Sequence, residues 1–237
     1  MKISRNQIDI LKSLKCQRLK DDEKNMYLVE EFSNSINDDI AQTLRNEAFK
    51  EDESNSVAYY VVKHPNGQIL FFFSLIRASK GITKDDLHKL HQLKLDILEE
   101  LEKEISNKEI ARVGSTFSGI ELVHFCSNTD TDDLWANLEL PQLRGTTIFW
   151  FFVVPMVLET LKYVGCQYLF LFAADRSKDE KLVRDYEDQL NFNRPDDLAT
   201  AKPFYDFTCK FMCHEISSLE KEQAEFFANF NPSHDNV

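Results

Sequence analysis

Apolar positions along the chain follow two spacings, and each spacing predicts one kind of element. Leucine and other apolar residues three and four apart, with charged residues between them, predict amphipathic helices. Continuous or alternating aromatic and β-branched runs predict strands. Helices are expected over 8–20, 36–52, 83–106, 146–164 and 177–192, and strands over 57–63, 68–76, 118–126, 166–173 and within 202–216.

The order of these elements predicts the fold class. His64–Gly67 reads HPNG between two strand patterns, which is typical of a hairpin turn. The segments 118–126, 146–164 and 166–173 form a strand–helix–strand unit, so the two strands should be parallel and joined by a right-handed crossover. We therefore expect an α/β protein with a mixed central sheet and helices on both faces.

The most apolar segment of the chain has two interpretations. Ile148–Leu158 is an unbroken apolar run, but Glu159 and Lys162 soon interrupt it. A membrane-spanning helix needs about 20 apolar residues, so a helix buried in the protein fits better and no membrane partner is expected. The N-terminal residues are too polar for a secretory signal, and five cysteines are consistent with reduced thiols in a cytoplasmic protein.

The net charge of the chain indicates which chemical classes of partner it favours. The 237 residues carry a formal net charge of -12, and basic residues are interspersed with acidic ones. Binding to a nucleic acid backbone depends on positive charge, so we expect no nucleic acid partner. An acidic surface favours a cationic amine or a basic peptide instead.

Two groups of residues are candidate metal ligands. Cys209 and Cys213 lie beside His214, and His88 and His91 are three residues apart on a predicted helix. Neither group has a second ligand pair at the spacing of a zinc site. Buried thiols on one strand face and a polar helix face explain them better, so no metal is expected.

A polar loop precedes the apolar helix and suggests an anion site. Residues 142–147 read QLRGTT, which places a glycine, an arginine and two threonines at the helix start. The first turn of a helix has unpaired N–H groups and the positive end of the helix dipole. Such a loop suits a phosphate or pyrophosphate, although a capped connector is the alternative.

In its element order and in this loop, the chain resembles the GNAT family of acyl-CoA-dependent N-acyltransferases. The family signature is Gln or Arg, two residues, Gly, one residue, and Gly or Ala; Gln142 and Gly145 match it, whereas Thr147 departs from it. Tyr186 and Phe192 resemble the family's tyrosine-bearing helix, with Asn191 where Gly is common.

The resemblance implies a domain organisation and a cofactor site. It covers a GNAT-like domain over 37–216, which leaves an N-terminal helical extension over 1–36 and a C-terminal tail over 217–237. Acetyl-CoA or another acyl-CoA would lie where the parallel strands splay apart. The implied binding residues are Val123, Phe125, Cys126, Gln142, Leu143, Arg144, Gly145, Thr146 and Thr147.

The resemblance also implies a chemistry, the direct attack of an amine on the thioester in a ternary complex. Tyr186 is the implied acid for the leaving thiolate. Glu121 and His124 are candidate bases, although strand alternation should place them on opposite faces. The acceptor would be an amine on a small molecule or a peptide, and a homodimer is left open. The rival hypotheses are a non-catalytic acyl-CoA-binding or sensing module and an acidic interaction protein.

Overall fold

A six-stranded sheet forms the centre of the computed structural model, which describes residues 1–77, 82–84, 116–175, 177–195, 198–199 and 209–231. The strand order is β1-β2-β3-β6-β7-β9, and a second, small sheet has the order β5-β4-β8. The strands of the large sheet are β1 (Lys15–Arg18), β2 (Ala58–Lys63), β3 (Ile69–Arg77), β6 (Gly119–Ser127), β7 (Tyr168–Ala173) and β9 (Lys210–Glu215), and those of the small sheet are β4 (Ile82–Lys84), β5 (Thr116–Phe117) and β8 (Leu198–Ala199).

Strand pairing confirms the predicted topology. β2 and β3 pair antiparallel across a turn in which Gly67 has φ +97°, a conformation that favours glycine. β6 and β7 are adjacent and parallel, as the strand–helix–strand order predicts. The other pairs in the large sheet are antiparallel.

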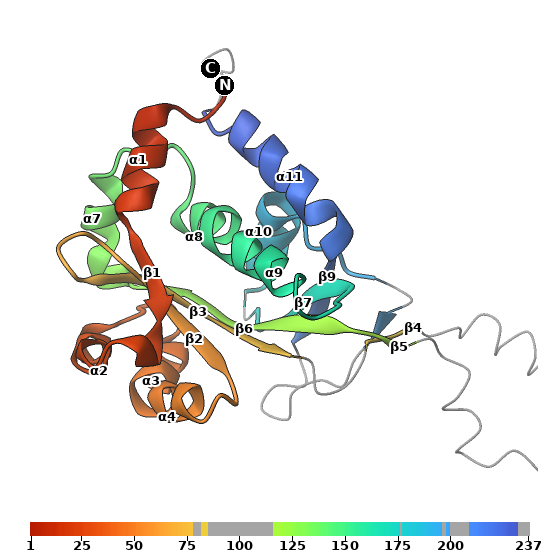
Figure 1. Cartoon of the computed structure of the whole chain (residues 1–237), viewed down its shortest axis with the longest axis horizontal. Coiled ribbons are helices and arrows are strands. Elements are labelled where there is room, and N and C mark those ends of the chain that lie inside the picture. Colours follow the sequence, from red (N-terminus) through yellow and green to blue (C-terminus); the bar gives the residue numbers. More distant parts are fainter. Residues whose placement is uncertain (78–81, 85–115, 176, 196–197, 200–208, 232–237) are drawn as a thin grey trace, which may run out of the picture.

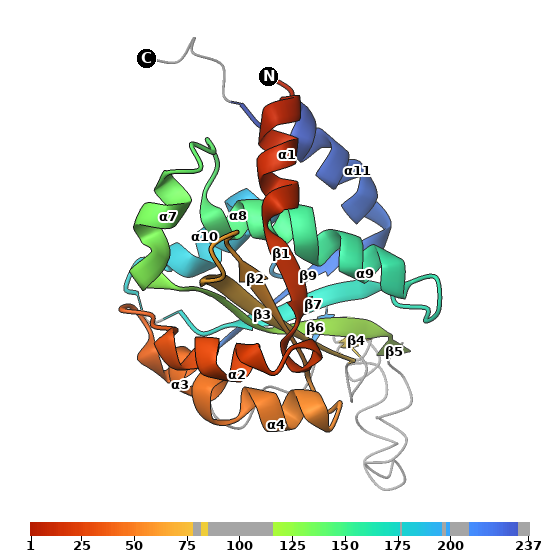
Figure 2. The same cartoon turned by 60° about the vertical axis from the view of Figure 1, so that its left-hand side comes forward.

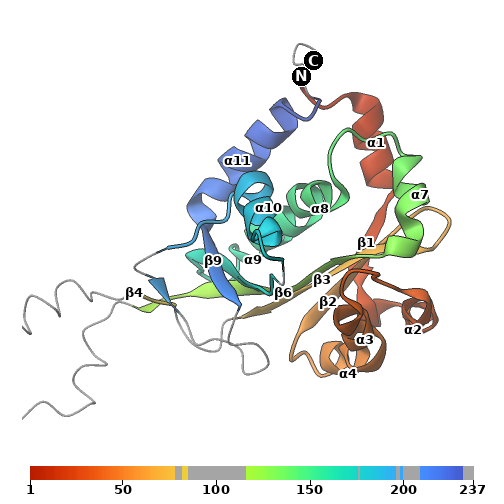
Figure 3. The ribbon, with the colours of Figure 1, turned by 180° about the vertical axis from the view of Figure 1, so that it is seen from behind.

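Helices cover both faces of the large sheet (Figures 1 and 3). On one face lie α1 (Arg5–Ser13), α8 (Arg144–Ile148), α9 (Val154–Thr160), α10 (Lys181–Leu190) and α11 (Ile216–Ala228), and on the other lie α2 (Lys24–Leu28), α3 (Asp38–Asn46) and α4 (Ala48–Glu53). A short helix, α7 (Asp132–Ala136), follows β6, as Figure 2 shows. The predicted mixed sheet with helices on both faces is therefore confirmed.

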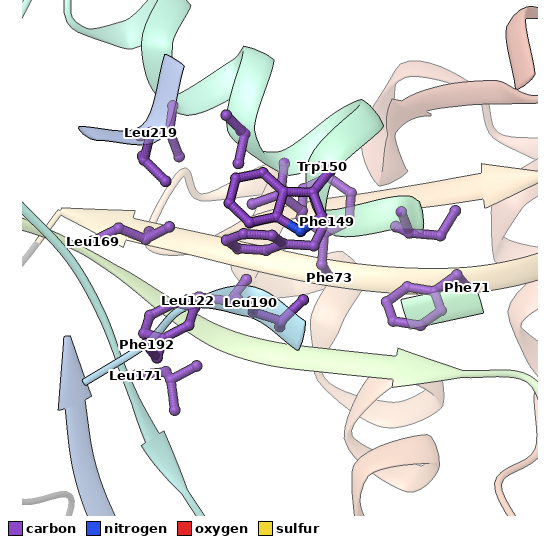
Figure 4. Close-up of a cluster of buried hydrophobic side chains, with 14 of the residues drawn as sticks. Phe71, Phe73, Leu122, Phe149, Trp150, Leu169, Leu171, Leu190, Phe192 and Leu219 are labelled. Atoms are coloured by element: carbon purple, nitrogen blue, oxygen red, sulfur yellow. The ribbon is translucent and has the colours of Figure 1, made fainter. Parts of the chain in front are cut away.

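Each face has its own hydrophobic core. The larger core lies between the sheet and the α8–α11 layer, where Phe149 and Trp150 meet Leu122, Leu169 and Phe192 (Figure 4). The smaller core, under α3 and α4, contains Phe32, Tyr59 and Phe72 among others. Aromatic side chains bury large areas, so the 19 phenylalanines of the chain account for much of both cores.

The apolar run after the QLRGTT loop is a buried helix with one irregular turn. α8 and α9 are joined by the π-helical turn η4 (Phe149–Val153), in which the Val154 N–H donates to the Phe149 carbonyl five residues back. Pro155 has no N–H to offer the preceding turn. The Trp150 carbonyl is instead satisfied by Gln223 Nε2 of α11 at 2.6 Å. No helix in the described ranges is long and apolar enough to cross a bilayer.

Several segments differ from the predicted elements. Residues 15–18 form the edge strand β1 rather than continuing a helix, and the connection after β6 contains η3 (Thr129–Thr131) and α7. By contrast, the C-terminal tail forms the helix that its sequence predicts, the 13-residue α11. This helix packs beside the N-terminus, where the Ile3 N–H donates to the Phe227 carbonyl at 2.8 Å. The helix expected over 83–106 does not begin at Thr83, because Thr83 and Lys84 belong to β4. The rest of that segment, with His88 and His91, lies outside the described residues. Within the described part of the chain, no group of three His, Cys, Asp or Glu side chains could hold a metal.

Candidate functional site

The parallel strands β6 and β7 pair over only three residues. Gly119, Ile120 and Glu121 face Tyr168, Leu169 and Phe170. Beyond this point β6 continues along β3 as far as Ser127, and β7 continues along β9 as far as Ala173, without pairing to each other. The two strands therefore separate at their C-terminal ends, as the family resemblance implies. We call this gap the β6–β7 opening.

Backbone donors of β6 point into the β6–β7 opening. The His124 N–H donates to Ser74 Oγ at 3.2 Å, and the Asn128 N–H donates to the Leu70 carbonyl at 2.9 Å, both on β3. Successive N–H groups of a strand point to opposite edges. The N–H groups of Phe125 and Ser127 therefore point away from β3, toward the edge that β7 has left.

A β-bulge at Val123 changes which side chains of β6 share a face. Ser74 pairs with His124 and the next residue, Leu75, pairs with Leu122, so Val123 is the extra residue. Leu122 and Phe125 consequently both pack against the α8–α11 layer, although they are three residues apart. Glu121 and His124 lie together on the opposite face. The expectation that alternation separates them is wrong, because it assumed a regular strand.

Glu121 has the properties of a proton acceptor. Its side chain is half-buried and makes no hydrogen bond or ion pair with any described residue. Burial raises the pKa of this carboxyl above its ordinary value. A carboxylate with a raised pKa holds a proton more tightly, which is what a base for an ammonium group near neutral pH requires.

His124 is held in place by its neighbours. Its Nδ1 lies 2.8 Å from Ser74 Oγ, and its ring stacks on Tyr59 and lies close to Phe72, with centroid distances of 5.5 and 6.0 Å. Burial lowers the pKa of His124 to about 4. The imidazole is therefore neutral at physiological pH and packed in the smaller core, which makes it a weaker candidate base than Glu121.

Tyr186 lies on α10 and packs against Phe192, with ring centroids 6.3 Å apart. Burial raises its pKa, and the nearby Cys126, Asp185 and Asp175 raise it further. A raised pKa keeps the phenol protonated, as an acid for a leaving thiolate must be. The hydroxyl makes no hydrogen bond with a described residue.

Cys126 lies on β6 between the two residues whose N–H groups point into the β6–β7 opening, and its own N–H points toward β3. Its side chain is buried in the smaller core and accepts a hydrogen bond from Asn34 Nδ2 at 3.2 Å. Burial raises the pKa of the thiol to about 12. A neutral, enclosed thiol is not a nucleophile.

Two side chains of the QLRGTT loop are bound to the protein rather than directed at an anion. Gln142 Nε2 donates to the Phe230 carbonyl at 2.7 Å. Arg144 Nη1 donates to the carbonyls of Asn128 and Leu70 at 2.7 and 3.0 Å. The same guanidinium also contacts Thr131 Oγ1 and the carboxylate of Asp132, and lies over the ring of Trp135. The expectation that Gln142 and Arg144 belong to a pyrophosphate site stays a prediction, and in this structure both side chains bind protein carbonyls.

The backbone of the same loop remains available. The first helical bond joins the Thr147 N–H to the Leu143 carbonyl at 2.9 Å, which leaves the N–H groups of Arg144, Gly145 and Thr146 without a backbone acceptor among the described residues. Leu143 is exposed, and no acidic residue lies in the first turn. Thr147 Oγ1 is buried with no hydrogen-bond partner in the described part of the protein. Three donors and the helix dipole thus favour an anion at this end of the 17-residue helix formed by α8, η4 and α9.

Gly145 lies where the start of the helix approaches the Phe125 ring of β6. A Cβ at this position would lie 3.5 Å from Cε1 of Phe125, which is ordinary van der Waals contact. Alanine therefore fits at this position, whereas a branched side chain would press on the Phe125 ring. The same ring packs edge-on against Phe71 and Phe149.

Comparisons with known proteins identify the fold. No protein-family model and no curated protein sequence matches the chain. Solved structures do match. A mutant of KacT is 12% identical, covers 88% of this chain and 98% of its own, and gives a TM-score of 0.54. AtaTR bound with AcCoA is 14% identical, with 88% and 97% coverage and a TM-score of 0.54. AtaT complexed with acetyl-methionyl-tRNAfMet is 12% identical, with 88% and 98% coverage and a TM-score of 0.52.

These likenesses extend over nearly the full length of the matched chains and confirm the predicted GNAT-like fold. They also contradict the exclusion of nucleic acid partners. Proteins of this fold have been solved with acetyl-methionyl-tRNAfMet and, as the AtaT-AtaR complex, with DNA.

The exclusion is wrong because it relied on the charge of the whole chain. Residues 1–20 contain six basic residues and one acidic residue, a local net charge of +5. A total of -12 hides this basic segment, which the structure gathers on α1, β1 and the residues after them. Net charge alone therefore excludes no polyanionic partner.

Arg144→Ala tests the structural role of the guanidinium. We expect a loss of about 3 kcal/mol or more in the free energy of unfolding, because charged hydrogen bonds contribute about 1.5–3 kcal/mol and the acceptors left behind are partly buried. Urea denaturation measures the effect. Arg184→Ala removes an exposed pair with Asp179 and should stay within about 0.5 kcal/mol of wild type. Wild-type stability of Arg144→Ala combined with weak acetyl-CoA binding would instead make this side chain a phosphate ligand.

Proposed function

We propose that the protein is an acyl-CoA-dependent N-acyltransferase with acetyl-CoA as its donor. One observation carries the proposal: β6 and β7 separate after three residue pairs, and the N–H groups of Phe125 and Ser127 point into the gap. A gap of this kind accepts an extended chain with carbonyl groups, such as pantetheine. The AcCoA-bound structure of a protein with the same fold supports this choice of donor.

The residues present fit the donor through their backbone. Pantetheine carbonyls would accept from β6, and the pyrophosphate would accept from the N–H groups of Arg144, Gly145 and Thr146 at the helix start. The side chains of Gln142 and Arg144 stabilise the loop by donating hydrogen bonds to protein carbonyls. Val123 contributes to the donor site as the extra residue of the β-bulge. The bulge shifts the register of β6 next to the opening.

In the chemical step that we propose, each of these groups has one role. A neutral amine attacks the acyl carbon, an N–C bond forms and the C–S bond breaks. A β6 N–H donates to the acyl oxygen as negative charge develops on it. Glu121 accepts the proton that the amine loses, and Tyr186 donates a proton to the departing thiolate. His124, neutral and bonded to Ser74, keeps the bulged part of β6 in place.

The acceptor we propose is a primary amine, and the class to test first is the amino group of an aminoacyl-tRNA. The AtaT complex with acetyl-methionyl-tRNAfMet supports this order of testing. Amines on peptides and small molecules are the next classes.

A second candidate function is a binding or sensing module that holds acyl-CoA without turnover. It is favoured by the side chains at the helix start, because Gln142 and Arg144 are bound to the protein and Thr147 replaces a small residue. The experiment that separates the two functions measures thiol release from acetyl-CoA with a panel of aminoacyl-tRNAs, peptides and amines. Release with one acceptor class establishes transfer. Tight binding without release from any of them establishes the second function, and absence of binding contradicts both.

Glu121→Gln should lower the rate of thiol release by about 10²–10⁴-fold, the usual contribution of a general base. The wild-type rate should fall as pH falls through the raised pKa of Glu121, because only the carboxylate accepts a proton.

The same pKa shift predicts how stability depends on pH. Glu121 binds its proton more tightly in the folded protein than in the unfolded chain, so the free energy of unfolding should decrease as pH rises through the raised pKa. The variant should therefore be at least as stable as wild type at pH 7. Glu159→Gln, on an exposed carboxylate of α9, is the matched control, and an equal rate in both variants would remove Glu121 from the mechanism.

Tyr186→Phe should retain acetyl-CoA affinity within about twofold and lower thiol release by about 10²-fold or more, because only the chemical step uses the hydroxyl. Calorimetry measures affinity, and thiol release under saturating acceptor measures the chemical step. Tyr163→Phe alters a tyrosine that is 81% exposed and should change neither quantity. A Tyr186→Phe variant with a normal rate would show that the thiolate leaves without this acid.

A further inference from the structure

A groove on the α1 side of the molecule has no part in the proposed chemistry. It has a volume of about 510 Å³ and lies between the α1–β1 junction and the helix formed by η4 and α9. In Figure 2, α1 and β1 cross in front of the helix that runs from α8 to α9. The lining residues are Lys12, Ser13, Leu14, Lys15, Cys16, Phe151, Phe152, Pro155 and Met156.

The floor of the groove is apolar and partly exposed. Phe151, Phe152 and Met156 are half-buried and Pro155 is exposed. The two phenylalanine rings meet edge-on, with centroids 4.9 Å apart, on the π-helical turn. Burial raises the pKa of Cys16 to about 12, so this thiol is neutral and adds to the apolar lining. Apolar side chains that line a concave surface gain free energy when a partner covers them.

The rim of the groove is basic. Lys12 and Lys15 are exposed, and neither makes an ion pair with a described residue. They belong to the segment 1–20, whose six basic residues and one acidic residue give +5, so the remaining 217 residues carry -17 to reach the total of -12. Exposed lysines beside an apolar floor favour a ligand that combines carboxylates with bulky apolar side chains.

An edge strand forms one wall. β1 pairs with β2 on one side and is the outermost strand of the large sheet. Its other edge faces no strand in the described part of the chain, so its backbone N–H and C=O groups can bond to an extended segment. Peptides commonly add to such edges, where backbone bonds give affinity and side-chain pockets give specificity.

We propose that this groove, defined by its nine lining residues, binds an acidic peptide segment of a partner protein that carries Phe, Leu or similar side chains beside Asp or Glu. An RNA strand fits the observations less well. The floor offers half-buried apolar side chains rather than exposed aromatic faces on which bases could stack. The groove is separate from the β6–β7 opening, so this proposal does not depend on acyltransferase activity.

The test uses fluorescein-labelled 12-residue peptides and fluorescence anisotropy with the full chain. One peptide set alternates Phe or Leu with Asp or Glu; the second replaces the acids by Asn or Gln, and the third by Lys. We expect the acidic set to bind, the amide set to bind at least about tenfold more weakly, and affinity to fall with salt. The double variant Lys12→Glu/Lys15→Glu should lose at least about tenfold in affinity for the acidic set. Lys178→Glu/Lys181→Glu makes the same change in charge at exposed positions near α10 and should bind like wild type.

Circular dichroism of both double variants shows that any loss of affinity is not a loss of fold. Met156→Gln leaves the net charge unchanged and places a polar side chain on the apolar floor of the groove. It should also weaken binding of the acidic peptides. The proposal is overturned if no acidic peptide binds, or if the acidic set binds both double variants equally. It is also overturned if a 12-nucleotide RNA binds at this site more tightly than the peptides, or if sedimentation shows that the groove variants abolish a dimer of this chain.

Discussion

The short pairing between β6 and β7 is the constraint on which the rest of the site depends. Three residue pairs hold the strands together, and then each strand follows a different neighbour. If β6 and β7 paired along their whole length, the N–H groups of β6 on that side would be hydrogen-bonded to β7 carbonyls. Because the strands separate, these donors face an opening, and the start of a 17-residue helix lies against β6 at Phe125. The proposed chemistry needs both features close together.

Arg144 has a structural task that the family resemblance does not imply. Its guanidinium joins the end of β6, the start of β3 and the inserted turn before α7 through four acceptors. The insertion of α7 lengthens the connection between β6 and the helix, and a long connection needs fixed points if the helix start is to stay beside the opening. Arg144 provides such a point, and Gln142 provides another at the C-terminal end of α11. Anion binding is then left to the backbone, which has no side chain to reposition.

The sequence predicts the parts of the fold that depend on local pattern. The hairpin follows from HPNG between two aromatic runs, and the parallel pair follows from a strand–helix–strand order. β1 is missed because its four residues, KCQR, carry no strand pattern and owe their conformation to β2. The bulge at Val123 is missed because it depends on the register with β3, and so the faces of Glu121 and His124 are assigned incorrectly. The direction of the Arg144 side chain depends on acceptors 12 to 74 residues away, which no local motif reveals.

The most direct test of the central claim is a titration of the isotope-labelled protein with acetyl-CoA, followed by amide NMR. We predict that the amide protons of Phe125 and Ser127, and those of Arg144, Gly145 and Thr146, shift together with one dissociation constant as they acquire acceptors. Amides of β1, on the far edge of the sheet, should stay in place. Saturable binding that leaves these five amides unchanged, or no binding at millimolar acetyl-CoA, would contradict the claim that the β6–β7 opening and the helix start form an acyl-CoA site.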